Sequence, residues 1–145
     1  MVELAFTHMV EIPRFRAAKH PQAVAYWFEG RETRFAELDQ HSSQIANGLI
    51  DMGVPPGERV AFLGKNMDIY YEILFGVVKA RGCMTGVNNR LAPPEIAYVI
   101  DDCQASVLFV AADFFEQLLA FVGVAAPVIL LVGARCLVPD HATGE

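Results

Sequence analysis

The chain has 145 residues, of which 54% are hydrophobic and 19% charged, and its formal net charge is −6. The length fits one domain, but charged residues usually make up about a quarter of a soluble domain. A low share of charged residues is expected of a membrane-associated protein, or of a piece of protein that other segments cover. The negative charge and the scattered lysines and arginines argue against a nucleic-acid or anionic-membrane partner, because either would need a basic surface.

Cysteines and the first residues indicate the compartment. Cys83, Cys103 and Cys136 are odd in number and form no C-x-x-C pair, so we expect small buried thiols in a reducing environment. The chain starts with an early acid and no basic segment, and Glu11 and Arg14 interrupt any apolar core. A signal peptide is therefore not expected, and the cytoplasm is the default location.

One uncharged stretch, from Gln117 to Ala134, is almost long enough to span a membrane. Gly123 and Pro127 interrupt it, and its second half is rich in β-branched residues. The pattern favours the end of a helix followed by a buried strand.

Short apolar runs alternate with amphipathic segments along the chain, with no internal repeat. A helix is expected at the start and a strand with a turn after it, and then helices and strands alternate. In chain order the expected elements are a helix at Pro13–Lys19, a strand at Ala23–Phe28, a turn at Glu29–Arg31, a helix at Phe35–Met52, a strand at Arg59–Leu63, a helix from Asn66 to about Arg81, a strand at Cys83–Val87, a helix at Pro94–Cys103, a strand at Ser106–Val110, a helix from Asp113 to about Val122 and a strand at Val128–Val132.

The helix predicted at Phe35–Met52 has the clearest pattern. Residues of its apolar face recur at spacings of three and four, which places them on one side of a helix. Gly53 supplies a left-handed residue after the helix, and the two prolines that follow prevent its continuation. The predicted buried stripe is Leu38, Ser42, Ile45, Leu49 and Met52.

The next helix is predicted to start with Asn66 as its N-cap. Tyr70, Leu74 and Val77 form its predicted buried stripe, with further apolar and small residues beside them. Gly82 is expected to end it.

Four apolar, largely uncharged strands separated by helices predict an α/β fold. Such strands form a parallel or mostly parallel sheet with helices on both faces, joined by right-handed crossovers. The predicted organisation is an N-terminal helical segment at about 1–22, an α/β core at 23–133 and a tail at 134–145. This pattern by itself says nothing about function.

Motifs for phosphate, metal and acid–base chemistry are mostly missing. The segment from Gly57 to Lys65 ends like a phosphate-binding loop, but its spacing is wrong and it contains a predicted strand. His8, His20, His41 and His141 have no ligand partners three or four residues away, so we interpret them as surface residues. Neither Asp101–Asp102 nor Ser42–Ser43 lies in a catalytic pattern.

The best local candidate for a functional turn is Asn88–Asn89–Arg90. It follows the carboxyl end of a predicted strand, where ligand crevices form in parallel sheets. A loop that only links a strand to a helix remains the alternative, and spacing alone favours that reading.

Seven segments, in order and spacing, resemble the start of the adenylate-forming enzymes, which include acyl-CoA synthetases, luciferases and peptide-synthetase adenylation domains. Each segment alone is weakly specific, but their succession in this order is a strong signal. The Asn-Arg-Leu pattern resembles the acyl-CoA synthetases more than the peptide-synthetase adenylation domains. The segments are Ala18–Pro21 with Ala23–Trp27, Thr33–Leu38, Ile45–Ile50, Gly53–Ala61 with Asn66, Lys79–Gly82, Val87–Leu91 and Pro94–Asp101.

The sequence departs from that family in three places. Arg34 stands where a helix-capping threonine is common, so with Glu37 only half of a capping box is expected. Arg81 stands where the family usually has a small residue beside its glycine. Cys83–Gly86 differs from the small, aliphatic run that is usual in the family. These differences put loop conformation in doubt, but not the family.

The resemblance implies a two-step ligase. A carboxylate attacks the α-phosphate of ATP·Mg²⁺ to give an acyl-adenylate and pyrophosphate, and the thiol of coenzyme A then displaces AMP. In the family this chemistry falls to a Ser/Thr/Gly-rich loop ending in Pro-Lys-Gly, a Thr-Glu pair, a ribose-binding Asp and a lid Lys. None of these motifs occurs in the 145 residues, so no catalytic, cofactor-binding or metal-binding residue is assigned.

The chain is therefore predicted to be part of a fatty-acid–CoA ligase-like enzyme, truncated relative to the family and inactive alone. Its expected partners are the remainder of the ligase and, through exposed apolar surface, a second copy of itself. The alternative is a non-catalytic interaction module that kept the fold. The acyl substrate and its chain length are not predicted.

Overall fold

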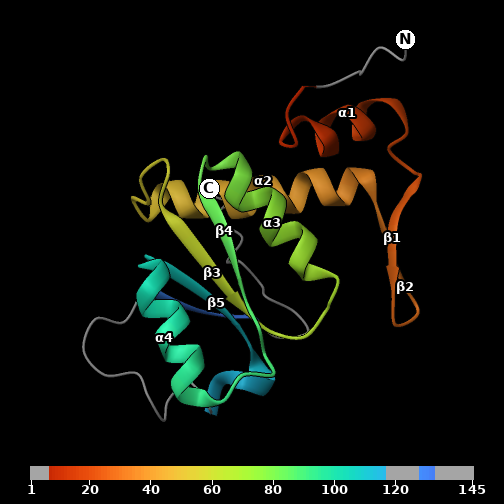
Figure 1. Cartoon of the computed structure of the whole chain (residues 1–145). Coiled ribbons are helices and arrows are strands. Elements are labelled where there is room, and N and C mark those ends of the chain that lie inside the picture. The colour runs from red at the N-terminus through yellow and green to blue at the C-terminus, as the bar shows by residue number, and fades with distance from the viewer. Residues whose placement is uncertain (1–6, 117–127, 133–145) are drawn as a thin grey trace, which may run out of the picture. The chain divides into compact units, whose positions relative to one another are not determined.

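The computed structural model describes residues 7–116 and 128–132. Its elements are drawn in Figure 1. They are α1 (Glu11–Lys19), β1 (Val24–Phe28), β2 (Arg31–Arg34), α2 (Phe35–Asp51), β3 (Arg59–Leu63), α3 (Ile69–Lys79), β4 (Cys83–Val87), α4 (Pro93–Cys103), β5 (Val107–Ala111), the 3-10 turn η1 (Ala112–Phe114) and β6 (Val128–Val132).

The chain divides into two compact units, each formed from two segments. Unit 1 comprises residues 1–59 and 66–84 and contains α1, the β1–β2 pair, α2 and α3. Unit 2 comprises residues 60–65 and 85–145 and contains α4, β5, β6 and most of β3 and β4.

The four-stranded sheet has the order β4-β3-β5-β6. β3 and β5 are parallel, with Val60 opposite Val107, and β5 and β6 are parallel, with Val107 opposite Val128. Every residue of β5 is buried, as is each residue of β3 after Arg59. Strands without a polar face are typical of a sheet covered on both sides, so the predicted α/β class is confirmed.

In unit 1, α2 and α3 pack closely because Gly76 has no side chain. A Cβ added at Gly76 would lie 2.5 Å from Ile45 Cγ2 and 3.1 Å from the carbonyl oxygen of Ser42. Ile73 and Val77 flank Gly76 on the buried face of α3. Gly76 therefore sets how closely the two helices approach.

The Phe35–Met52 prediction is confirmed to within one residue. Leu38, Ser42 and Leu49 are buried, and Gly53 has φ +77°. Met52 is 44% exposed and does not belong to the buried stripe. It lies at the C-cap, beyond the last regular turn, so helical spacing no longer determines its direction.

The turn and the first strand of the β1–β2 hairpin were predicted, but the second strand, β2, was not. Phe28 pairs with Arg31, and the two turn residues both have positive φ, +47° at Glu29 and +83° at Gly30. This is the left-handed geometry of a two-residue hairpin turn. The sequence Arg-Glu-Thr-Arg of β2 lacks apolar alternation, so pattern alone gave no strand there.

The start of α3 corrects a second prediction. The helix begins at Ile69, and its N-cap is Asp68, whose Oδ1 accepts a hydrogen bond from the Ile69 N–H at 2.9 Å. Asn66 lies two residues before this cap. The buried stripe is centred on Ile73, Gly76 and Val77, while Tyr70 and Leu74 are only partly buried.

The remaining described boundaries match the predicted ones or differ from them by one or two residues. The first helix starts two residues earlier, at Glu11, and β5 is shifted by one. Asp113 lies in a 3-10 turn, Phe115 and Glu116 after it are helical, and residues 117–122 of the predicted helix fall outside the described residues. The strand at Val128–Val132 is confirmed. Within the described residues, no helix combines the length and the hydropathy that a bilayer crossing requires.

The N-terminus of α2 forms half of a capping box, as predicted. The backbone N–H of Arg34 donates to Glu37 Oε2 at 2.8 Å. A guanidinium has no acceptor atom, so the Arg34 side chain cannot complete the reciprocal bond. It instead donates to the carbonyl oxygen of Gln22 at 2.6 Å.

Replacing Glu37 by alanine is expected to lower the free energy of unfolding by about 1 kcal/mol, because an N-terminal cap is lost. Replacing it by glutamine keeps an acceptor oxygen and should cost less. Urea unfolding of both variants measures the difference. An equal loss of stability in the two variants would show that the negative charge of Glu37, and not the capping hydrogen bond, stabilises the helix.

Candidate functional site

Polar loops follow the carboxyl ends of three neighbouring strands of unit 2. Gly64 and Lys65 follow β3, Asn88 follows β4, and η1 follows β5. In the sheet these strands are neighbours in the order β4-β3-β5. The carboxyl edge of a parallel sheet is where ligand crevices form, so this edge is the candidate site.

The predicted turn Asn88–Asn89–Arg90 lies at this edge, and hydrogen bonds of its two asparagine side chains hold it in place. Asn89 Nδ2 donates to the carbonyl oxygen of Gly64 at 2.6 Å, which ties the loop after β4 to the end of β3. Asn88 Oδ1 accepts from the Arg90 N–H at 3.0 Å. Both asparagine side chains thus shape the turn.

Gly64 allows this loop to lie close to the strands. A Cβ at Gly64 would lie 2.7 Å from Phe62 Cζ and 3.0 Å from Ala111 Cβ. A side chain would not fit without movement of both neighbours. The carbonyl oxygen that accepts from Asn89 is therefore presented by a position that suits glycine alone.

The charged groups at the edge are exposed. Lys65 Nζ lies 3.1 Å from Asp113 Oδ2, and both side chains are 68% exposed. Such a pair contributes about 0–1 kcal/mol to stability and is screened by salt. Arg90 is exposed and bonds through its side chain to none of the described residues. In the part of the edge that the structure describes, there is an ordered turn and one unpaired cation, with no acid, base or nucleophile placed for catalysis.

The other motifs considered in the sequence have structural roles. Gly57 has φ +89°, its N–H donates to the Arg81 carbonyl oxygen at 2.8 Å, and β3 follows it, so Gly57–Lys65 is not a phosphate-binding loop. Ser43 Oγ donates to the Asp39 carbonyl oxygen at 2.6 Å, within its own helix. Among the residues that the structure describes, no three His, Cys, Asp or Glu side chains group as metal ligands.

Two histidines have carboxylate partners, which corrects the prediction that they have none. The partner of His41 is distant in sequence, whereas Glu11 lies three residues after His8. His41 Nδ1 lies 2.8 Å from Glu72 Oε1, across 31 residues of sequence. His8 Nδ1 contacts Thr7 Oγ1 at 2.9 Å and Glu11 Oε1 at 3.5 Å. His20 is exposed as predicted, and His141 lies outside the described residues.

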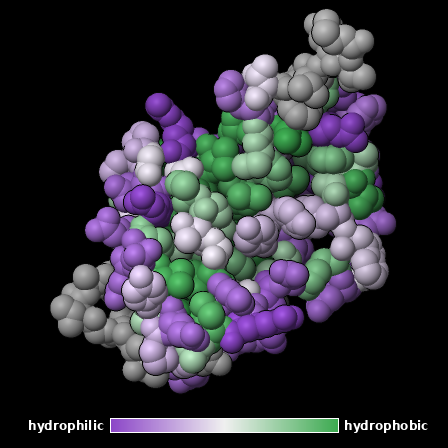
Figure 2. All heavy atoms as spheres, in the orientation of Figure 1, coloured by the Kyte–Doolittle hydropathy of each residue, from purple (hydrophilic) through white to green (hydrophobic). Residues whose placement is uncertain are grey.

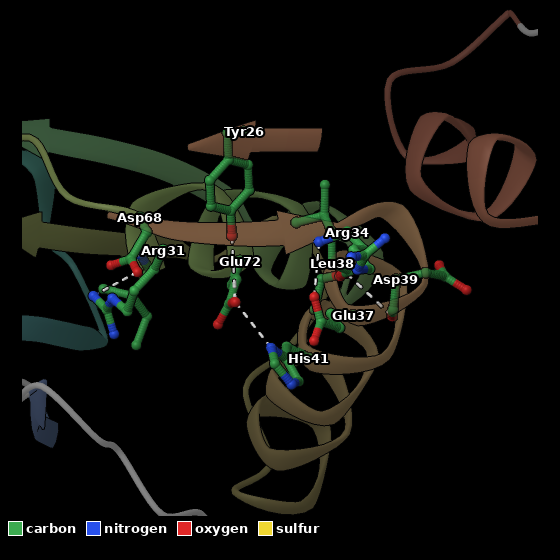
Figure 3. A network of polar contacts seen from close by, with 11 residues as sticks. Tyr26, Arg31, Arg34, Glu37, Leu38, Asp39, His41, Asp68 and Glu72 are labelled. Atoms are coloured by element: carbon green, nitrogen blue, oxygen red, sulfur yellow. Dashed lines mark hydrogen bonds and ion pairs between the residues drawn. The ribbon is translucent and has the colours of Figure 1, made fainter. Parts of the chain in front are cut away.

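The contact of His41 is part of a polar network in unit 1 that joins the hairpin to α2 and α3 (Figure 3). Glu72 Oε1 accepts a hydrogen bond from Tyr26 Oη at 3.3 Å, in addition to the contact with His41. Arg31 of β2 lies 2.7 Å from Asp68 Oδ2 at the N-cap of α3. Burial, with the nearby negative charge of Glu72, raises the pKa of the Tyr26 hydroxyl, so Tyr26 stays neutral and donates.

A second ion pair in unit 1 is more deeply buried. Lys79 Nζ donates to Asp39 Oδ1 at 2.6 Å, to the Asp39 carbonyl oxygen at 2.9 Å and to Ser43 Oγ at 2.9 Å. The side chains of Lys79 and Asp39 are only 10% and 23% exposed. All three ammonium protons are used, so this group is a structural link between α2 and α3.

The sequence also carries a direct family signal. Residues 14–142 match the family described as AMP-binding enzyme. The chain belongs to the AMP-binding enzyme family. The resemblance drawn from seven short segments is thereby confirmed, and the family match covers nearly the whole chain.

Curated relatives of this family cover a range of acids. The chain is 38% identical over 106 residues to the fatty acid–acyl-carrier-protein ligase ScoC of Streptomyces coeruleorubidus, covering 73% of this chain and 20% of that protein. It is 38% identical over 108 residues to a feruloyl-CoA synthase of an Amycolatopsis species, covering 74% of this chain and 22% of that protein. The chain thus spans about a fifth of the length of the curated relatives it matches.

Solved structures of the family share the fold. The anthranilate CoA ligase AuaEII, in complex with anthranoyl-AMP, matches with a TM-score of 0.81 and 26% identity, covering 90% of this chain and 26% of that one. A fatty acyl CoA synthetase of Mycobacterium tuberculosis matches with a TM-score of 0.75 and 25% identity, covering 86% of this chain and 26% of that one. The α/β architecture described above is therefore that of AMP-binding family enzymes.

Proposed function

We propose that this chain is the structural α/β portion of an ATP-dependent acid–CoA ligase of the AMP-binding family. In the complete reaction, a carboxylate and ATP give an acyl-adenylate and pyrophosphate, and coenzyme A then takes the acyl group and releases AMP. The match over residues 14–142 carries this proposal. A fatty acid is one acid class consistent with it, since one relative is a fatty acid ligase.

The role proposed for the chain in that reaction is to supply scaffold. The candidate edge holds an ordered turn at Asn88–Arg90, in which Asn89 is bonded to the end of β3. The sequence contains no Ser/Thr/Gly-rich loop ending in Pro-Lys-Gly. Stabilising the charge that develops on transferring phosphate requires such donors and a metal ion. ATP, Mg²⁺ and coenzyme A are accordingly proposed as ligands of the whole enzyme.

ATP–pyrophosphate exchange tests this role. The 145-residue chain, supplied with ATP·Mg²⁺ and a panel of fatty and aromatic acids, should show no exchange above the protein-free background. A calorimetric titration with ATP should show no heat of binding. Exchange catalysed by the chain alone would contradict a scaffold role.

A chimera tests the family function separately. Residues 14–142 would replace the matching segment of the Amycolatopsis feruloyl-CoA synthase, and the chimera should retain feruloyl-dependent exchange. A chimera that folds cooperatively and binds ATP but catalyses no exchange would contradict the proposal that this chain can serve in a ligase.

We further propose that the chain self-associates, most simply as a two-fold symmetric dimer. Figure 2 shows apolar residues at the surface over α2 and α3. Among the described residues, seven large apolar side chains are markedly exposed, and six of them belong to unit 1. These are Met9, Val24, Trp27, Ile50, Met52 and Tyr71, while Tyr98 belongs to unit 2. Exposed apolar patches favour association.

Light scattering at micromolar concentration is expected to report a mass above 15.9 kDa, the mass of one chain. Replacing Trp27, which is 66% exposed, by lysine should shift the equilibrium toward monomer. Replacing Tyr98, which is 68% exposed, by lysine is the matched control and should change it less. A monodisperse monomer of the unaltered chain would refute the proposal.

A further inference from the structure

Unit 1 has a surface hollow that plays no part in the proposed function. Its volume is about 500 Å³, and it is lined by residues of α1 and α2, the residue before α1 and the end of α3. This volume is within the range of small-molecule sites. All of the lining residues belong to unit 1, so the hollow does not depend on how the two units are placed.

One part of the lining is apolar. It is formed by Val10 and Phe15 on the α1 side, and by Ala46 and Ile50 of α2. Ile50 is 55% exposed and lies at the rim, while Ala46 is buried. Such a lining would release water when an aryl or short alkyl group is bound.

The polar part of the lining contains one cation that is not paired with an acid. Arg14, Lys79 and Glu11 are its charged residues, and Lys79 forms an ion pair with Asp39 at 2.6 Å. Glu11 is already engaged, since its Oε2 accepts from the Thr7 N–H at 3.0 Å. Among the described residues of the lining, Arg14 is therefore the cation available to bind an anion.

Two hydrogen-bond donors in this lining are unused. Lys79 gives its protons to Asp39 and Ser43, and the Asp39 carboxylate offsets its charge, so it offers no free donor. Arg14 and Asn47 are exposed, and neither side chain bonds to any other residue in the described part of the chain. A guanidinium and an amide N–H suit the two oxygens of a carboxylate.

We propose that this hollow binds a small amphipathic carboxylate, with the carboxylate at Arg14 and Asn47 and the apolar body against Phe15, Ala46 and Ile50. The site shares no residue with the candidate site at the carboxyl edge of the sheet. The proposal does not depend on the ligase function, because its ligand is bound and not transformed.

Nuclear magnetic resonance titration of the isotope-labelled 145-residue chain with 4-phenylbutyrate tests this site. Backbone amides at 10–15 and 43–50 should shift and saturate, with a Kd in the millimolar range expected for a ligand of this size. The neutral analogue 4-phenylbutanol should bind about tenfold more weakly, because it lacks the charge-assisted hydrogen bonds.

Two variants locate the ligand. Arg14→Gln removes the charge at an exposed position and should weaken binding of 4-phenylbutyrate by about tenfold. Ile50→Glu places a negative charge at the exposed rim and should weaken it similarly. Arg90→Gln, the same change at an exposed position in unit 2, should leave Kd unchanged.

The expected pattern is selective loss in Arg14→Gln and Ile50→Glu with no change in Arg90→Gln. Equal affinity for the acid and the alcohol would overturn the proposal. So would shifts located outside the hollow, the absence of saturable shifts, or equal binding by Arg14→Gln and the unaltered chain.

Discussion

Replacing Asp39 by alanine is expected to lower the free energy of unfolding by about 3 kcal/mol. The change leaves the Lys79 ammonium, 10% exposed, without the carboxylate that lies 2.6 Å away. Removing one partner of a buried pair is costly because the remaining charge stays desolvated, typically by about 3–5 kcal/mol. We expect the lower end because Lys79 keeps the Asp39 carbonyl oxygen and Ser43 Oγ as acceptors.

The reverse substitution should be milder. Lys79→Met keeps much of the apolar stem, and the Asp39 carboxylate that it leaves is 23% exposed and reaches water more easily. The double variant, Asp39→Ala with Lys79→Met, should be more stable than Asp39→Ala alone. Urea unfolding of the two single variants and the double variant measures the coupling between the two residues. Additive losses would show that the pair does not act as one unit.

Replacing Gly76 by alanine is expected to destabilise the chain by about 1–3 kcal/mol, although alanine is the better helix former. The added Cβ would lie 2.5 Å from Ile45 Cγ2, 2.7 Å from Ile45 Cβ and 3.1 Å from the Ser42 carbonyl oxygen. Rotation of the Ile45 side chain relieves only the first of these contacts. The others require α2 and α3 to move apart.

Gly48 is the matched control for Gly76. It also lies in a helix, α2, but a Cβ added there would meet nothing within 4 Å. Gly48→Ala should therefore stabilise the chain by up to about 1 kcal/mol, the helix-propensity term alone. Ile45→Ala combined with Gly76→Ala should recover part of the loss, because it removes the opposing methyl groups. A Gly76→Ala chain as stable as Gly48→Ala would disprove the steric account.

The sequence predicted the elements best where a local signal was strong. The helix at Phe35–Asp51 has regular apolar spacing and ends before Gly53, whose φ of +77° is the conformation predicted for it. β3 was predicted without error because Arg59–Leu63 is a short apolar run between turn residues. The hairpin strand β2 was missed because its side chains carry no apolar period.

The candidate edge was predicted in part. Asn88–Asn89–Arg90 was identified from its place after a strand, a position that topology brings to the carboxyl edge. Its partner, Gly64, lies 25 residues earlier in the sequence. No local pattern connects the two, so the tie between them could be seen only in the fold.

By itself, the sequence determined the family, the α/β class and the boundaries of most elements, because these follow from periodicity, turn residues and the succession of short segments. Tertiary structure alone decided which polar side chains meet. Tyr26, His41 and Glu72 come from three different elements, and Lys79 reaches Asp39 across 40 residues. Helical and strand periods fix the direction of a side chain within its own element, whereas these contacts depend on how the elements pack against one another.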